Sequence, residues 1–444
     1  MIAGFIKDVS IALIVLGIII VIHELGHFLV AKFFKIKVET FSVGFGPRLI
    51  GYRHGDTDYR ISAFPLGGYV KMAGETVGDS VTGEPHEFLS KPKWQRFLVA
   101  SAGPAMNVVL AVGLLTGLFM YGTEVPEFSE GDAIVGGVEK GSAAEAAGLQ
   151  TGDRIVSIAG KASPNWEEVE ARIVTNAGQT LPVVVNRNGK TIESFMTPVK
   201  QGKYETGYAG LQPKVRVTNV IGSIVAGSPA EGSGLKPGDE ITAVNGIDLK
   251  TSGRGVSEII QTLPDKTFPL TIARNGETQQ IQVTPNIQDG RRMIGIGFVL
   301  PTIMVKEGFS GAFNRAIDKN VEYGTLIFQV LGKLVKRETS MKSVDGPIGI
   351  MRATSQFYDA GFGPLLMLMA MISLNLGLMN LLPIPILDGG VMLLLIVEGL
   401  MGHDLSLAFK ERVIQVSFVF LLTVMVFVLY NDVVKMLPSG QPGP

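Results

Sequence analysis

The chain has 444 residues and nearly balanced charge, with 39 Lys and Arg against 40 Asp and Glu, and it contains no cysteine. The lack of cysteine excludes disulfide bonds, thiolate metal ligands and a cysteine nucleophile, so any bound metal must use His, Asp or Glu. The balanced charge gives no indication of a nucleic-acid partner. Mean hydropathy is positive although 18% of the residues are charged, which indicates apolar spans alternating with polar domains.

The first apolar run, residues 9–30, is long enough to cross a hydrocarbon core of about 30 Å as a helix. We therefore predict a transmembrane helix over residues 1–31. A signal peptide is disfavoured, because no small-residue cleavage site follows the run. Basic residues are frequent in residues 32–96. By the positive-inside rule this segment is expected to be cytoplasmic, with the N-terminus outside.

The same run contains an HExxH motif made of His23, Glu24 and His27. Residues four apart share one face of a helix, so the two imidazoles can bind one metal ion. Glu24 lies beside them, where a general base for water activation is needed. The alternative is a pair of packed or exposed histidines. Because ionisable groups are costly to bury in a membrane and are functional by default there, the metal site is favoured.

Residues 40–72 are strand-like and rich in turn residues, which predicts a β-hairpin within the segment 32–96. One interpretation is a small cytoplasmic sheet. The other is a membrane-associated hairpin that dips towards the active site and offers its free edge, from Tyr59 to Met72, to an extended substrate. Candidate substrate-binding residues on this edge are Gly67, Gly68 and Tyr69.

A second span is predicted over residues 97–121. Its small residues, Ala102, Gly103 and Pro104 among them, allow another helix to approach closely. Asn107 is polar within this apolar segment. We expect it to form a hydrogen bond to a partner helix, with a position facing the active site as the alternative.

Residues 123–212 and 213–304 contain an internal repeat. The pattern A-E-x-[A/S]-G-L-x-x-G-D-x-I begins at Ala144 and again at Ala230, and each copy later has a strand ending in an Asn-Gly hairpin turn. The two copies resemble PDZ domains. That resemblance implies binding of extended peptides at a strand edge and no chemistry. Alternatively, either copy is a spacer whose groove is unused.

Residues 305–362 indicate amphipathic helices, for example over residues 312–336, followed by a loop through Val344-Asp345-Gly346-Pro347-Ile348-Gly349. These helices suit a membrane surface or packing against soluble domains equally well.

A third apolar segment, residues 363–400, is interrupted by prolines after Asn380. Catalytic zinc usually takes three protein ligands and water, and HExxH supplies two. Asp388 lies among apolar residues and is the best candidate for the third ligand, ahead of Glu398 and Asp404, which lie nearer a polar loop. Alternatively, Asp388 caps the helix that follows. A fourth span is predicted over residues 413–435.

The motifs together resemble the site-2 protease family of intramembrane zinc metalloproteases, and the likeness covers essentially the whole chain. It implies a polytopic α-helical membrane protein with about four transmembrane helices, a cytoplasmic-side re-entrant β-hairpin and two periplasmic PDZ-like α+β domains. It also implies that His23, His27 and Asp388 bind Zn²⁺ and that Glu24 is the base. Asn375 and Asn380 match family positions that handle substrate near the catalytic centre.

The resemblance further implies regulated intramembrane proteolysis in the bacterial inner membrane. The expected partners are the lipid bilayer, a single-pass anti-sigma factor already cut in the periplasm, and signal-peptide remnants, with activation of an envelope stress response. One alternative is a membrane-anchored PDZ adaptor or chaperone without turnover, which has no need of Glu24. A second is a transporter, but the spans show no inverted repeat.

Overall fold

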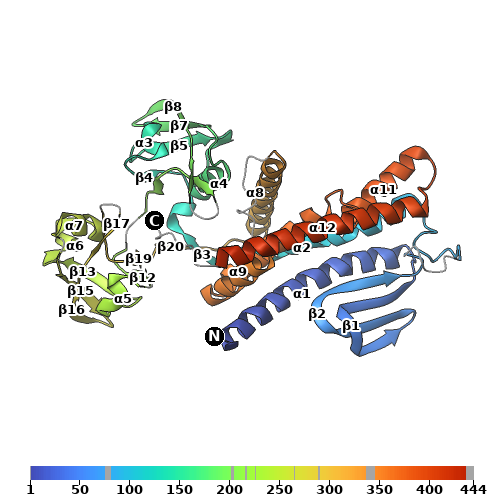
Figure 1. Ribbon diagram of the computed structural model, residues 1–444. Coiled ribbons are helices and arrows are strands. Elements are labelled where there is room, and N and C mark those ends of the chain that lie inside the picture. Colours follow the sequence, from blue (N-terminus) through green and yellow to red (C-terminus); the bar gives the residue numbers. More distant parts are fainter. Residues whose placement is uncertain are drawn as a thin grey trace. The chain divides into compact units, whose positions relative to one another are not determined.

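The computed structural model describes residues 2–75, 82–201, 205–215, 218–225, 227–264, 266–288, 291–336 and 346–436. The chain divides into two compact units. One consists mainly of residues 1–123 and 305–437 and contains the long apolar helices, and the other consists mainly of residues 124–201 and 206–304 and is rich in strands (Figure 1). We call them the helical unit and the repeat unit.

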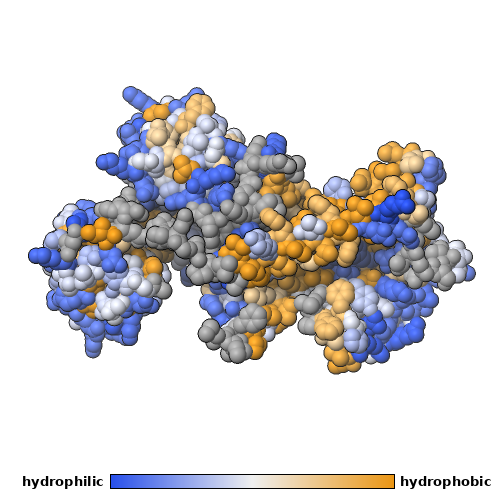
Figure 2. Space-filling model, viewed as in Figure 1, coloured by the Kyte–Doolittle hydropathy of each residue, from blue (hydrophilic) through white to orange (hydrophobic). Residues whose placement is uncertain are grey.

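Seven helices of the helical unit lie within the described residues: α1 (Ile2–Phe33), α2 (Lys93–Tyr121), α8 (Phe309–Val335), α9 (Pro347–Ala360), α10 (Phe362–Asn380), α11 (Asp388–Met401) and α12 (Leu407–Met436). Among these, α1, α2, α10 and α12 are long and apolar enough to cross a membrane, judged by length and composition. Their number agrees with the four spans that the sequence predicts. Figure 2 shows hydrophobic side chains along the exposed surface of α12. Only 6% of the most apolar 18-residue stretch of this helix is buried.

The centre of the helical unit is α2, which packs against α1, α8, α10 and α11. Ala111 and Leu115 on α2 are fully buried against small residues of α8 and α10, such as Ala312 and Ala370. Small residues at a helix interface let two backbones approach closely, which favours packing where lipid removes the usual hydrophobic driving force. This central position lets α2 hold residues that come from both ends of the chain.

Strands β1 (Val38–His54) and β2 (Thr57–Met72) form the predicted hairpin, which packs beside α1 (Figure 1). Residues 40–43 of β1 are in register with both 58–61 and 68–71 of β2, and residues 50–53 of β1 also pair with 58–61. Residues 58–61 therefore have partners on both sides. The expectation of a free edge running from Tyr59 to Met72 is wrong for its first half, because β2 bends near Gly67 (φ 114°) and leaves only residues 68–72 at the edge.

The segment Gly346-Pro347-Ile348-Gly349 is not the predicted loop. Pro347 is the first residue of α9, a position where its missing N–H and its fixed φ suit a helix start. The backbone N–H groups of Gly346 and Ile348 donate to the Asp432 carboxylate at 2.9 and 3.0 Å, so a side chain from α12 satisfies this helix N-terminus. The preceding residues 337–345 lie outside the described part of the chain.

The repeat unit contains two four-stranded sheets of the same topology. The first has the order β6-β5-β7-β8 and the second the order β14-β13-β15-β16. The strands of the first sheet are β5 (Arg154–Ile158), β6 (Lys161–Ala162), β7 (Leu181–Arg187) and β8 (Lys190–Met196), and those of the second are β13 (Glu240–Val244), β14 (Ile247–Asp248), β15 (Phe268–Arg274) and β16 (Glu277–Val283). Each sheet has its own buried apolar cluster. The internal repeat is therefore structural as well as sequential.

The other elements of the repeat unit are short and also recur. Each copy has a helix in its conserved pattern, α3 (Ala143–Ala146) or α5 (Pro229–Ser233), and a later one, α4 (Trp166–Thr175) or α7 (Val256–Thr262), with α6 (Leu249–Ser252) extra in the second. The remaining short segments are β3 (Thr123–Pro126), η1 (Glu127–Ser129), β4 (Val135–Val138), β9 (Val199–Gln201), β10 (Thr206–Tyr208), β11 (Leu211–Pro213), β12 (Ile221–Ile224), β17 (Asn286–Gln288), β18 (Arg291–Met293), β19 (Ile296–Phe298) and β20 (Thr302–Val305).

Both Asn-Gly turns have positive φ at both residues, as the predicted hairpins require. Each copy also uses the aspartate of its Gly-Asp turn in the same way. Asp153 accepts from Arg187 Nε at 2.6 Å, and Asp239 accepts from Arg274 Nε at 2.7 Å. The hydrogen bond from Arg274 holds the pKa of the Asp239 carboxyl below its ordinary value. The Gly-Asp of the repeated pattern thus fastens the turn to a strand of the sheet.

Candidate metal and active site

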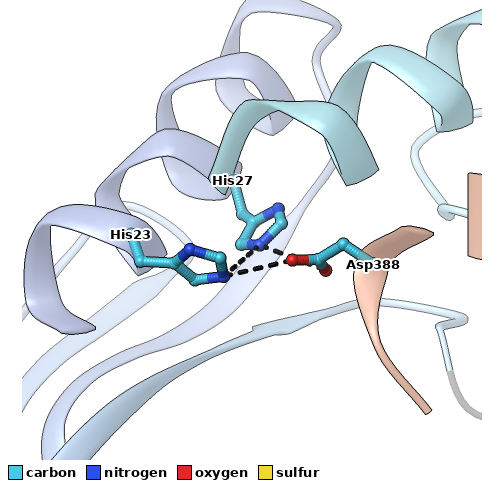
Figure 3. A group of neighbouring side chains, drawn as sticks. All are labelled: His23, His27 and Asp388. Carbon is cyan, nitrogen blue, oxygen red and sulfur yellow. Dashed lines mark hydrogen bonds and ion pairs between the residues drawn. The ribbon is translucent and has the colours of Figure 1, made fainter. Parts of the chain in front are cut away.

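Two histidines and one aspartate meet between α1 and α11 (Figure 3). His23 Nε2 lies 3.2 Å from one carboxylate oxygen of Asp388, and His27 Nε2 lies 3.5 Å from the other. The two imidazole Nε2 atoms are 3.3 Å apart. All three side chains point into one space, although Asp388 is separated from the histidines by most of the chain.

This geometry fits a zinc ion. Ligand atoms about 2.0–2.1 Å from a tetrahedral ion lie roughly 3.3 Å from one another, which matches the three separations above. Two imidazoles and a carboxylate form a usual donor set for catalytic zinc and leave a fourth position open. Asp388 is the first residue of α11, and both oxygens of its carboxylate lie towards the two imidazoles, so the carboxylate is available as a ligand.

Neighbouring groups of α2 orient the two imidazoles. His27 Nδ1 lies 2.8 Å from the carbonyl oxygen of Val99, which fixes a proton on Nδ1 and leaves the Nε2 lone pair for a metal. His23 Nδ1 lies 3.1 Å from Nδ2 of the buried Asn107 side chain, whose amide oxygen and nitrogen exchange places when the amide flips. Asn107 thus forms the expected bond between helices, and the bond also faces the metal site. A His23 that binds metal through Nε2 carries its proton on Nδ1 and needs the Asn107 oxygen as acceptor.

Glu24 lies on the same helix between the two histidines and next to the sheet. Its Oε2 accepts a hydrogen bond from the backbone N–H of Val70 at 3.1 Å. A Cβ added to Gly68 would lie 3.5 Å from Glu24 Cγ, so the strand runs close beside the carboxylate. The edge of β2 therefore positions Glu24, and Glu24 faces the same cavity as His23 and His27.

The site opens into a cavity of about 490 Å³ within the helical unit. Its walls come from α1, β2, α2, α11 and α12, and they include all three predicted zinc ligands and Glu24. Apolar side chains such as Phe88, Leu395 and Ile414 form much of the remaining surface. A mostly apolar cavity with a few convergent polar groups is the usual form of a substrate site.

The structure brings some of the predicted substrate-binding residues to this site and leaves others outside it. Tyr69 lines the cavity, and Gly68 lies on the edge of β2 beside Glu24. Gly67 occupies the bend before that edge and faces α1. Asn380 Nδ2 lies 3.5 Å from His23 Nε2, at the limit of a hydrogen bond. Asn375 is exposed on α10 and is not among the residues that line the cavity.

The close approach of α2 to the metal site depends on Gly103, which the sequence indicated only as a packing residue. A Cβ at this position would lie 2.2 Å from His27 Nε2 and 2.8 Å from His23 Cε1. Gly26 on α1 has the same role, because a Cβ there would lie 2.3 Å from the Ala102 carbonyl oxygen. The only sequence signal for this contact was the run of small residues in α2.

We expect Gly103→Ala to weaken zinc binding by at least about tenfold and to reduce cleavage with it, because the new methyl group displaces the His27 imidazole. Helix propensity cannot account for a loss, since alanine favours a helix more than glycine does. Gly113→Ala is the matched control on the same helix, with nothing within 4 Å of its added Cβ. Zinc content after dialysis against graded chelator measures the effect. Equal zinc retention in the two variants would contradict this role of Gly103.

Known proteins match this chain over almost its whole length. The profile of peptidase family M50 matches residues 11–424. A Neisseria meningitidis protein named as a zinc metalloprotease is 32% identical, over 95% of this chain and 97% of its own. The regulator of sigma-E protease from Salmonella typhimurium is 31% identical, over 95% of this chain and 97% of its own length. The one from Escherichia coli is 29% identical, over 97% of this chain and 99% of its own length.

The family match covers the segments that carry His23, Glu24, His27 and Asp388, and the geometry of these residues fits the zinc chemistry of the family. Two of the relatives named above exceed 30% identity over nearly their full length. This chain therefore belongs to peptidase family M50 and is a zinc metalloprotease of the site-2 type.

Proposed function

We propose that this protein cleaves transmembrane segments of other membrane proteins, with His23, His27 and Asp388 as zinc ligands and Glu24 as the catalytic base. The observation that carries the proposal is the position of His23 and His27 within α1, a helix long and apolar enough to cross a membrane, with Asp388 beside them. A soluble, polar peptide would have to enter the membrane to reach such a site, which is unfavourable. A hydrophobic segment is already in the bilayer and can reach it.

The chemistry divides between the metal and Glu24. Zinc supplies Lewis acidity, which polarises a peptide carbonyl and makes a water molecule easier to deprotonate. The Glu24 carboxylate accepts the proton of the attacking water and donates it to the nitrogen of the leaving amine. The N–H of Val70 holds Oε2 of this carboxylate, which leaves Oε1 for the proton.

The edge of β2 supports substrate binding. A helical substrate hides its carbonyl groups in i to i−4 hydrogen bonds and must unwind locally before it is cut. Residues 68–72 of β2 have a strand partner on one side only and run beside Glu24. A substrate that adds to this edge as a further strand stays extended at the catalytic residues. Asn380 is in place to contact the substrate near His23.

The proposed setting is the bacterial inner membrane, with both termini and the repeat unit in the periplasm and the active site near the cytoplasmic side. Two relatives are named as regulators of sigma-E protease. From these names and from the resemblance to the site-2 protease family, we propose that the substrates are a single-pass anti-sigma factor and signal-peptide remnants, and that cleavage activates an envelope stress response. The two repeats are proposed to be PDZ-like domains that exclude substrates whose periplasmic domain has not yet been removed.

The exclusion role can be tested by deleting the repeats. The N–H of Glu127 donates to the carbonyl oxygen of Pro301 at 2.9 Å, so the ends of the region 127–301 lie together and can be joined by a short Gly-Ser linker. We expect the deleted variant to cleave an untrimmed substrate about as fast as a trimmed one, whereas the full chain cleaves only the trimmed form. The trimmed substrate is the control for an intact active site. Untrimmed substrate that stays uncut by the active deletion variant would contradict the exclusion role.

A further inference from the structure

The active-site cavity has a second polar region, built from charged residues at the start of α2, near the end of α11 and at the start of α12. Arg96, Glu398 and Lys410 line the same cavity as the zinc ligands. Arg96 is 4% exposed and Glu398 is 0% exposed. Charged side chains are rarely buried to this degree unless they are paired. We call these three residues the charged subsite.

The charges in this region are unequally paired. Glu398 Oε1 is held by Lys410 Nζ at 2.5 Å and by the N–H of Leu405 at 2.9 Å. Asp404 is held by Lys93 Nζ at 3.0 Å. The nearest carboxylate oxygen to Arg96 belongs to the same Asp404 and lies 4.0 Å away, beyond hydrogen-bond distance. Arg96 therefore shares Asp404 with Lys93 and is the more weakly paired of the two cations.

Two atoms of the charged subsite lack a hydrogen-bond partner within the described residues. They are Nε of Arg96 and Oε2 of Glu398, and both are buried. A buried guanidinium without a close anion is costly, because its charge is removed from water with little in return. Glu398 cannot serve as that anion, since Lys410 already neutralises it. A substrate carboxylate would give Arg96 a closer anion than Asp404, and a planar guanidinium suits a carboxylate well.

The position of the subsite indicates which part of a substrate it would contact. Asp388 and Glu398 are the first and eleventh residues of α11, and Val391 and Leu395 line the cavity between them. Ten residues of helix span roughly 15 Å. An extended peptide advances about 3.3 Å per residue, so a chain lying along this wall reaches the subsite roughly four or five residues from the zinc ligands.

We infer that Arg96 is a specificity-determining residue that binds the carboxylate of an Asp or Glu side chain of the substrate, roughly four or five residues from the cleaved bond. The inference rests on the proposed function, because it assumes that an extended peptide occupies the cavity. Lys93 and Asp404 hold the charged subsite in place from outside the cavity.

The test uses a set of single-pass membrane substrates. Mass spectrometry first locates the bond that is cleaved. Each substrate then carries Glu, Gln or Leu at one position, from the third to the sixth residue on each side of that bond. With the wild-type protein, we expect Glu to raise kcat/KM by about tenfold over Gln at one position, because a charge-assisted bond in a buried site is strong. In Arg96→Gln this ratio should fall to about one, and in Arg96→Lys it should be partly retained, because the charge remains and the planar fork is lost.

The ratio of Glu to Gln substrates is taken within each variant, so a general loss of activity does not affect it. Lys35→Gln is the matched control, because it removes an exposed cation outside the cavity. A wild-type protein that shows no preference for Glu at any position, or the same preference in Arg96→Gln, would overturn the inference. The inference would also be overturned if the wild type preferred only substrates with a free carboxyl terminus over the same substrates with an amidated terminus. Failure of the wild type to cut any substrate would instead refute the proposed function, and the subsite with it.

Discussion

Replacing Glu24 with Gln is expected to lower kcat by at least about a hundredfold while the protein keeps its zinc. The substitution is nearly isosteric and retains an oxygen that can accept the hydrogen bond from Val70 N–H. It removes the carboxylate that accepts a proton from water, and general acid–base catalysis usually contributes a factor of about 10²–10⁴. Cleavage of a reconstituted membrane substrate and zinc content should be measured on the same sample.

Glu39→Gln is the matched control, because Glu39 is also near the hairpin but pairs with Lys71 at the surface. This variant should cleave at the wild-type rate, since exposed ion pairs contribute little. Cleavage by Glu24→Gln at the wild-type rate would exclude Glu24 as the base. If a contaminating protease caused that cleavage, the chain itself would have no shown activity. The result would then favour a zinc-binding membrane adaptor over a protease.

Replacing Asp388 with Ala should remove both zinc and cleavage. The remaining ligands, His23 and His27, lie on one helix and supply two of the three donors that catalytic zinc sites use. We expect zinc affinity to fall by more than about a hundredfold, since changes to groups that only orient a ligand already cost 10–100-fold. Metal analysis after gel filtration in dilute chelator measures the loss directly.

Asp359→Ala is the control for removal of an acidic residue in the helical unit. Asp359 is exposed, pairs with Lys7 and lies outside the cavity, so this variant should retain zinc and cleavage. Asp388→Ala that retains stoichiometric zinc would show that another residue supplies the third ligand. The same experiment separates the two catalytic roles, because Glu24→Gln loses activity with zinc bound and Asp388→Ala loses the zinc itself.

The sequence by itself determined the features that depend on local pattern. The spacing of His23 and His27 puts two imidazoles on one helix face wherever the helix lies, and long apolar runs identify the four spans through length alone. The repeated Gly-Asp and Asn-Gly turns gave the two copies of one domain, because those residues are required by backbone conformations that few others adopt.

Only the tertiary structure decided which distant residues meet. It brings Asp388 within 3.2 Å of His23 across almost the whole chain, limits the free edge of β2 to residues 68–72, and leaves Asn375 outside the cavity. It also shows that Gly103 must lack a side chain and that the buried Arg96 has its ion-pair partner Asp404 as far away as 4.0 Å. These are properties of packing between segments, and no local pattern records the distance between two side chains that come from different helices.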